Sequence, residues 1–570
     1  MNRSEIKARQ KAERKKCLEE ILRSDAKKKL IVSGPGTGKT FTFGELLRLE
    51  PGGTNLALTF IKRLVNDMEV TLSPYAETKT FHAYCKKILH QQNGKIELNP
   101  YLTKIVEKDA QILGKKPSRF DFKFYTLDET GGEIAFYLKR GDYYGVVSFN
   151  DAVYRIYKIL KKKPDLIPEL GQIVIDEYQD FNLLEISFIK ELSKKGSILI
   201  VGDDDQAVYD NSRAASPKFL RNLHKAGQFT KFQLPFCNRC PEVIVEATNC
   251  LIKVAQRNSY FRDRIPKRYE CYFEDKERDS TRYPRIIMCK CTIASVIPKY
   301  ILKEISRIRQ EDIDESNIEG KEYPTVLIVG QKQYLREIEK QLKPVYPQIS
   351  YVSKKEEEYN IIEGYKLILN DEKSNFGWRI LAEFLIKPDK LKRIISKSEK
   401  GKPIIDLLSK KFVENQLKVI EAIRVIQSGE SLTETSKLSL KRITGKNADL
   451  IIEFFTPKEI EEEVEPLPLR ILLTSFVGCK GLSVGHVFIV GANNGSIPRD
   501  PDDIKDIEIS KFIVAMTRTR KQCHIITNKW LVAPVIKGRR VRPFDESIFT
   551  SWIPARLIEN RGNKAAKDFK

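Results

Sequence analysis

The sequence has no long hydrophobic run. No stretch of its 570 residues approaches the length of a membrane span, and the opening MNRSEIKARQKAERKK has no apolar segment of the kind that a secretory signal needs. Its ten cysteines follow no regular disulfide framework. These absences argue against a membrane-spanning protein or a disulfide-stapled secreted one. We therefore expect a cytoplasmic protein with free thiols and no membrane partner.

A zinc site is also poorly supported. Cys237 and Cys240 have the spacing of a ligand pair, but Cys289 and Cys291 do not. The sequence also has no tandem short repeat and no low-complexity tract. The remaining expectation is a folded, multidomain protein, since 570 residues are too many for one hydrophobic core.

Positive charge is plentiful. Lysine and arginine number 100 against 77 acidic residues, which gives a formal net charge of +23. An excess of this size favours a polyanionic partner, most often nucleic acid. General solubility or a lysine-rich genome is the alternative explanation.

Apolar strand patterns fall into two groups, and each group is interrupted by a helical, charged stretch. This pattern predicts two α/β cores, each with one insertion. The predicted order is a first core over 1–75, a helical insertion over 76–170, the rest of the first core over 171–235, a second core over 236–384, a short second insertion over 385–465, the rest of the second core over 466–555, and a basic C-terminal tail over 556–570.

A glycine-rich loop follows the first predicted strand, in LIVSGPGTGKT at residues 30–40. Glycines let the backbone approach phosphate closely, and the N-terminus of the next helix favours an anion. Strand, loop and helix in this order predict a triphosphate cradle. The residues assigned to it are Gly34, Gly36, Thr37, Gly38, Lys39 and Thr40.

Two adjacent acids end a later buried-strand pattern, in IVIDEYQD at residues 173–180. Asp176 and Thr40 are the expected ligands of Mg²⁺, and Glu177 is the expected activator of water. The strand SILIVG leads into Asp203, Asp204, Asp205 and Gln206, at the end of a parallel sheet where ligands bind. ATP and Mg²⁺ are therefore the predicted cofactors.

Eight segments, in this order and spacing, resemble the UvrD/Rep/PcrA-like superfamily 1 DNA helicases. They are GPGTGKT, LTFIKRLVNDM, TKTFHAYCKKIL, IDEYQDFN, IVGDDDQAVY, the arginine-bearing 234–241, TSFVGCKGLS and VAMTRTR. The resemblance implies an α/β fold with two RecA-like parallel-sheet P-loop domains, each with a mainly helical insertion. It also implies ATP-driven 3′→5′ movement on single-stranded DNA, with strand separation at junctions between single and double strands.

The resemblance assigns roles to individual residues. It implies catalytic roles for Lys39, Glu177, Gln206, Arg239 and Arg518, with both arginines at the γ-phosphate. It places Phe41 and, with less support from spacing, Gln10 near the nucleotide. It implies DNA contacts at Thr59, Phe60, Thr80, Phe81, His82, Tyr209 and Thr474.

Several positions depart from the family pattern. Phe41, Asn238 and Ser483 stand where the family has groups near the base and sugar. The family tryptophan after GDDDQ is absent, so Tyr209 is the aromatic residue left there. These departures predict loose nucleotide selectivity with intact phosphate chemistry.

Two functions suit this sequence best. One is a DNA helicase or translocase acting in repair, recombination or the processing of phage and plasmid DNA. The other is a DNA-stimulated ATPase that serves as the motor or sensor of a larger complex, with a protein partner such as a nuclease. An RNA-directed relative and a non-motor P-loop kinase fit the motifs less well.

Overall fold

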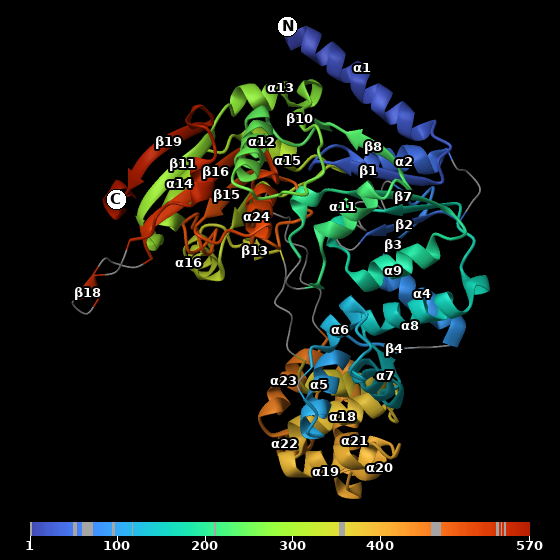
Figure 1. Cartoon of the computed structure of the whole chain (residues 1–570). Helices are drawn as coiled ribbons and strands as arrows, with labels where there is room; N and C mark the ends of the chain where they lie inside the picture. The colour runs from blue at the N-terminus through green and yellow to red at the C-terminus, as the bar shows by residue number, and fades with distance from the viewer. Residues whose placement is uncertain are drawn as a thin grey trace.

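Two parallel β-sheets and one helical module make up the protein (Figure 1). The computed structural model describes residues 3–49, 54–59, 72–93, 97–116, 118–209, 213–352, 359–457, 469–531, 535–536, 539–540 and 543–569. Within these residues, no helix combines the length and the apolar character that crossing a membrane requires.

The first core is a six-stranded parallel sheet in the order β3-β2-β6-β7-β1-β8. Its central strands are buried along nearly their whole length, as expected for a parallel sheet covered by helices on both faces. The strands are β1 (Lys28–Ser33), β2 (Leu56–Thr59), β3 (Glu77–Thr80), β6 (Gln172–Ile175), β7 (Ser197–Gly202) and β8 (Thr230–Leu234). The helices are α1 (Arg3–Leu22), α2 (Lys39–Arg48), α9 (Leu183–Leu192) and α11 (Pro217–Lys225).

The second core is a seven-stranded parallel sheet in the order β13-β14-β12-β15-β16-β11-β19. Its strands are β11 (Ile286–Ile293), β12 (Val326–Val329), β13 (Ser350–Tyr351), β14 (Ile471–Thr474), β15 (Val484–Val490), β16 (Thr519–Trp530) and β19 (Ile558–Lys564). Its helices are α12 (Glu242–Arg257), α13 (Phe273–Arg282), α14 (Ile297–Ile305), α15 (Gln310–Ser316), α16 (Lys332–Leu342), α24 (Asp506–Met516) and α25 (Ile548–Ser551). Two short strands, β9 (Phe236–Cys237) and β10 (Glu270–Cys271), pair next to the chain crossing between the cores. A separate antiparallel pair, β17 (Val535–Ile536) and β18 (Arg539–Arg540), follows β16 in the chain.

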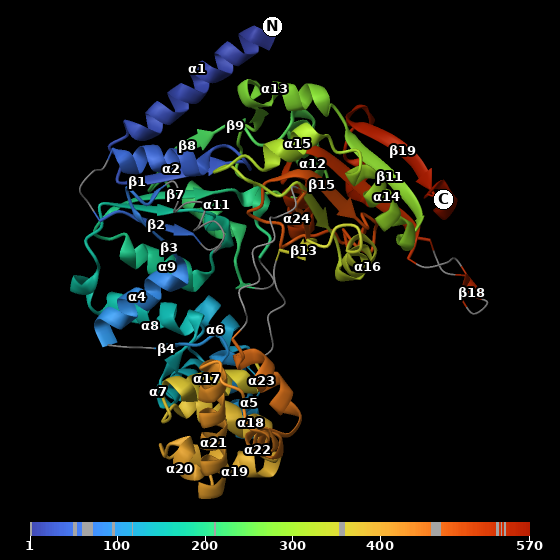
Figure 2. The same cartoon turned by 180° about the vertical axis from the view of Figure 1, so that it is seen from behind.

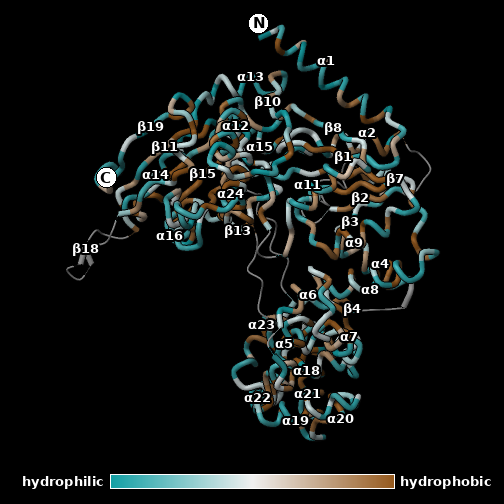
Figure 3. The backbone as a smooth tube through the Cα atoms, viewed as in Figure 1, coloured by the Kyte–Doolittle hydropathy of each residue, from teal (hydrophilic) through white to brown (hydrophobic). Residues whose placement is uncertain are grey.

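The expected fold class is confirmed, because both sheets are parallel and each core carries a helical insertion. Figure 3 shows the hydrophobic residues gathered in the strands at the centre of both sheets, whereas α1 is mostly hydrophilic.

The two insertions pack against each other as one helical module. The first contains α4 (Phe81–Asn93), β4 (Glu97–Leu98), α5 (Leu102–Ile112), α6 (Phe120–Thr126), α7 (Glu133–Tyr144), β5 (Val146–Val147) and α8 (Phe149–Lys162). The second contains α17 (Ile361–Asn370), α18 (Asn375–Leu385), α19 (Pro388–Ser398), α20 (Ile404–Leu407), α21 (Lys410–Gln427), α22 (Glu434–Thr444) and α23 (Ala448–Phe455). Both insertions share one hydrophobic cluster with the first core, and both views show them together below the sheets (Figures 1 and 2).

A buried charge cluster joins the two insertions. The fully buried Asp109 of α5 accepts hydrogen bonds from Arg140 of α7 and from Arg379 of α18, the latter at 2.8 Å from Nε. The hydroxyl of Tyr144 donates to the same carboxylate at 2.5 Å. One carboxylate therefore holds two guanidinium groups from different insertions.

Three predicted boundaries need correction. The strand β3 lies in the predicted insertion 76–170, β19 lies in the predicted tail 556–570, and the second insertion begins with α17 rather than at residue 385. Both strands are polar and each lies at the edge of its sheet, so they lack the continuous apolar run of a central strand. The apolar faces of α17 and α18 cover the other insertion instead of a sheet, so their sequence resembles that of core helices.

We expect Asp109→Asn to lower the free energy of unfolding by about 3–5 kcal/mol, because two buried guanidinium groups lose their shared counter-charge. Glu372→Gln is the matched control: its partner is Arg424, both side chains are 52% exposed, and a cost under about 1 kcal/mol is expected. Urea unfolding of the two variants measures the difference. Equal midpoints would mean that the cluster does not hold the module together.

Candidate nucleotide-binding site

The phosphate loop lies between β1 and α2, facing the second core. Gly36 (φ 69°) and Gly38 (φ 84°) adopt left-handed backbone conformations that favour glycine. A Cβ on Gly36 would lie 2.5 Å from Cβ of Arg239, so only a hydrogen there lets the two cores approach this closely. The loop lines a cavity of about 530 Å³.

Residues from both cores line this cavity. From the first core they include Pro35, Gly36, Thr37, Gly38, Lys39, Thr40, Asp176, Glu177 and Gln206, and from the second Asn238, Arg239, Ser483, Arg518 and Arg520. All five proposed catalytic side chains and both proposed magnesium ligands are therefore at one cavity. Gly34 is not in its wall: it packs against the ring of Tyr269, and its carbonyl accepts from Thr37.

The two adjacent acids have different electrostatic surroundings. Burial raises the pKa of Asp176 to about 6, and the Glu177 carboxylate acts in the same direction. Burial also acts to raise the pKa of Glu177, but the ammonium groups of Lys39 and Lys480 outweigh it and lower that pKa to about 2. Lys39 Nζ lies 3.5 Å from Glu177 Oε1. Glu177 is thus held as a carboxylate beside the phosphate loop, and the contacts with Lys39 and Lys480 make it a weaker base than a free glutamate.

Lys480 lies where the two cores meet, and the sequence analysis gave it no role. Its ammonium lies 2.5 Å from Asp180 and 3.6 Å from Glu177, and it donates to the backbone carbonyl of Gln206 at 2.6 Å. Lys480 belongs to the second core, so these three contacts join it to the first core. The signal was present in the CKGL segment, which carried part of the resemblance without a role for its lysine.

Arg518 also links the two cores. Its Nη2 donates to Oε1 of Gln206 at 2.7 Å, and its Nε donates to the carbonyl of Val514 in α24. Burial and the nearby Arg239 guanidinium lower the pKa of Arg518 to about 10, so it stays charged at neutral pH. An arginine in this position can stabilise negative charge on a transferring phosphoryl group.

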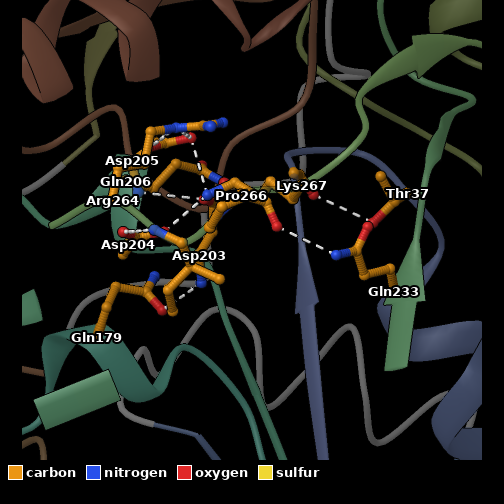
Figure 4. Close-up of polar contacts among 12 residues, drawn as sticks. Thr37, Gln179, Asp203, Asp204, Asp205, Gln206, Gln233, Arg264, Pro266 and Lys267 are labelled. Atoms are coloured by element: carbon orange, nitrogen blue, oxygen red, sulfur yellow. Dashed lines mark hydrogen bonds and ion pairs between the residues drawn. The ribbon is translucent and has the colours of Figure 1, made fainter. Parts of the chain in front are cut away.

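The acidic run after β7 does not face the cavity as a metal site. Asp203, Asp204 and Asp205 are close enough to share an ion, but the ammonium of Lys267 lies 2.7–2.8 Å from an oxygen of each (Figure 4). Of this run, only Gln206 lines the cavity. The Lys267 ammonium thus occupies the position beside these three acids where the sequence analysis expected a ligand.

The nucleotide-base end differs most from the predicted site. Gln10 is buried, and its amide bonds the backbone of Cys271 and Phe273 in this arrangement. Its contact with nucleotide stays a prediction. Phe41 is 52% exposed and lines a small depression beside the loop with Arg14 and Phe236. Arg14 lies over the ring of Tyr272. Helix α1 therefore places the Arg14 guanidinium beside Phe41, and not the Gln10 amide.

Several predicted DNA contacts are core residues. Phe81 is fully buried against Phe181 and Phe188, and it has no free face for a base. The side chains of Thr59 and Thr474 are also buried. The motif TFH at residues 80–82 could be recognised in the sequence, but the sequence did not indicate which of its side chains is buried. Phe60 lies outside the described residues.

The other predicted DNA contacts lie nearer the surface. Thr80 is half-buried and caps the start of α4 through the Ala83 amide, and Tyr209 is half-buried beneath Lys480. Burial lowers the pKa of His82 to about 3, so its ring is neutral at pH 7. His82 makes an edge contact with Phe149, which is 41% exposed. Phe149 is an exposed aromatic residue that the sequence analysis missed.

Comparison with known proteins identifies related sequences. A family model described as an AAA domain matches residues 19–212. The chain is 40% identical over 234 residues to DNA helicase II of Haemophilus influenzae, covering 32% of each protein. It is 22% identical over 587 residues to a probable DNA helicase II homologue of Mycoplasma genitalium, covering 86% of this chain and 81% of that one. It is 24% identical over 231 residues to the ATP-dependent DNA helicase PcrA of Bacillus subtilis, covering 32% and 31%. The chain thus spans about a third of the length of two of these relatives.

We expect the site to discriminate weakly between ATP and GTP. The Gln10 amide is already bonded, and a stack on Phe41 accepts any base because every base has a π-face. The values of kcat/KM for the two nucleotides should agree within about tenfold. Phe41→Ala should raise KM for both nucleotides, each by a loss of binding free energy of about 1 kcal/mol or more. A preference for ATP above ~100-fold would contradict this expectation.

Proposed function

We propose that this chain, a member of the UvrD/Rep/PcrA-like superfamily 1 helicases, hydrolyses ATP to move along single-stranded DNA in the 3′→5′ direction and separate duplex strands. The observation that carries the proposal is the bond between Arg518 and Gln206. It joins the two cores inside the cavity that holds Lys39 and Glu177.

Each cavity residue has a chemical role in this proposal. Lys39 and the loop N–H groups bind phosphate, Glu177 accepts a proton from water, and Arg239 and Arg518 stabilise charge on the γ-phosphate. Hydroxyl and carboxylate oxygens suit Mg²⁺, so Thr40 and Asp176 would hold it. When bound, that ion would neutralise phosphate charge.

Closure of the cleft provides a link to movement. Arg518 and Lys480 come from the second core but contact Gln206, Glu177 and Asp180 of the first. Insertion and loss of a γ-phosphate would therefore change contacts between the cores. Two cores that alternately close and open can each shift their hold on a DNA strand.

The DNA surface is proposed to include Phe149. It is exposed, its ring contacts His82, and it begins α8 of the first insertion. Aromatic rings of this kind stack on bases without sequence preference. The net charge of +23 suits the phosphate backbone.

A second candidate function is a DNA-stimulated motor or sensor within a larger complex, with a nuclease as one class of partner. The observation favouring it is the buried Asp109 cluster, which fastens the second insertion to the first. An insertion held in this way has little freedom to rearrange on duplex DNA.

The decisive experiment measures ATPase turnover of the full chain with and without single-stranded DNA, and then displacement of duplexes carrying 3′ or 5′ tails. A helicase requires stimulation by DNA and displacement of the 3′-tailed duplex. Stimulation without displacement would favour the motor subunit. No response to DNA would refute both.

Lys39→Ala and Glu177→Gln should both abolish hydrolysis, with different effects on binding. Lys39→Ala should weaken ATP binding, because the ammonium meets phosphate in the ground state. Glu177→Gln should leave binding intact and reduce kcat by at least ~10²-fold, because only proton acceptance is lost. Equilibrium nucleotide binding and single-turnover hydrolysis separate the two effects. Normal turnover in Glu177→Gln would rule out its role as base.

Phe149→Ala should weaken single-strand binding by about 1–3 kcal/mol without changing ATPase turnover at saturating DNA. Phe454→Ala is the control, since Phe454 is 49% exposed but lies on α23, in the other insertion. Fluorescence anisotropy with a labelled oligonucleotide measures both. If the two variants bind alike, Phe149 does not contact DNA.

A further inference from the structure

A short segment of the second core reaches back to the first. Residues 264–268, here called the clasp, follow α12 and precede β10. The carbonyl of Pro266 accepts from Gln233 at the edge strand β8, and the backbone N–H of Ile265 donates to Asp204 after β7. The clasp therefore fixes the connection between α12 and β10 to the end of the first sheet.

Lys267 is the centre of the clasp. Its side chain is 2% exposed, and its ammonium lies 2.8 Å from Asp203 Oδ1, 2.7 Å from Asp204 Oδ1 and 2.8 Å from Asp205 Oδ2. Burial acts to lower the pKa of Lys267, but the three carboxylates outweigh it and raise that pKa. Lys267 is thus a permanent buried cation.

Asp203 connects Lys267 to the cavity. While Oδ1 faces Lys267, Oδ2 accepts a hydrogen bond of 2.6 Å from Nε2 of Gln206. The Oε1 atom of the same amide accepts from Arg518 at 2.7 Å. A carboxylate only accepts and a guanidinium only donates, so the Gln206 amide has one orientation that satisfies both neighbours.

We propose that Lys267 and Asp203 are positioning residues that set the amide orientation of Gln206 and thereby the place of Arg518 at the γ-phosphate. The proposal rests on the ATPase function proposed above. Neither residue lines the nucleotide cavity, and both act through Gln206. Since Lys267 belongs to the clasp, the orientation depends on how the second core is seated on the first.

The two neighbouring acids provide an internal comparison. Asp205 contacts Lys267 and Arg264, and Asp204 contacts Lys267 and Arg221. Neither side chain is bonded to Gln206. Substituting Asp205 therefore changes the charge of the cluster as much as substituting Asp203 does, while leaving the amide contact in place.

Asp203→Asn should reverse the orientation of the Gln206 amide. Lys267 would retain the side-chain oxygen of the new residue, and the new NH₂ group would face Gln206. The Gln206 amide would then turn, so that its own NH₂ group meets the donors of Arg518. We expect kcat for DNA-stimulated ATP hydrolysis to fall at least ~10-fold with KM for ATP changed less than ~3-fold, because the phosphate contacts remain.

Asp205→Asn is the matched control and should keep kcat within about threefold of the parent chain. Adding Lys267→Met to Asp203→Asn should raise kcat again, since the cluster becomes neutral and the substituted amide is free to turn its oxygen to Gln206. A purely structural role predicts the opposite sign, because a second buried partner is lost. Equal kcat in Asp203→Asn and Asp205→Asn, or a further fall in the double variant, overturns the proposal.

A second pair serves if Asp203→Asn does not fold. Lys267→Met and Arg264→Met each remove one cation of the cluster, but only Lys267 contacts Asp203. Lys267→Met should lower kcat at least ~10-fold more than Arg264→Met, and equal values contradict the proposal. Turnover of the parent chain is measured first: its absence refutes the ATPase function itself, whereas normal turnover with indifferent variants refutes only the positioning role.

Discussion

The contact between Arg518 and Gln206 unites two sheets that otherwise have separate hydrophobic cores. Each sheet can bury its own strands without the other, as the separate core clusters show. The nucleotide cavity, in contrast, exists only where they meet, because its lining comes from both. Lys480 and the clasp strengthen the same meeting point from other directions. The chemistry therefore depends on the seating of one core against the other more than on the stability of either.

Local sequence was sufficient for the parts of the site that lie within one strand, loop and helix. The phosphate loop and the acids at 176 and 177 could be predicted because glycine spacing and strand ends place them regardless of distant contacts. Lys480 and Lys267 could not be predicted in this way. Their partners are hundreds or tens of residues away, and a lysine in a chain with a hundred basic residues carries no signal of burial. Side-chain direction was the other limit: Phe81 and Phe149 are both aromatic residues at the start of a helix, but only Phe149 is exposed.

The fold showed the same division. Central strands were visible as apolar runs, whereas β3 and β19 are polar edge strands. An edge strand has a neighbour on one side only, so fewer contacts restrict its residues. The extent of the second insertion was misplaced because apolar helices look alike in sequence, whether they cover a sheet or another helix. Asp109 exemplifies the missing information. In the sequence it is one acidic residue of an amphipathic helix, and only the fold brings Arg140 and Arg379 into contact with it.

Gly36 is constrained from two sides at once. Its positive φ serves the loop that cradles phosphate, and its missing side chain leaves room for Arg239 of the opposite core. A larger residue there would strain the loop backbone, and its Cβ would also meet Arg239 and keep the cleft from closing fully. The absence of a side chain at Gly36 thus sets the minimum gap between the two halves of the site. Mutational tolerance at this position would report the closeness of the cores as directly as it reports the shape of the loop.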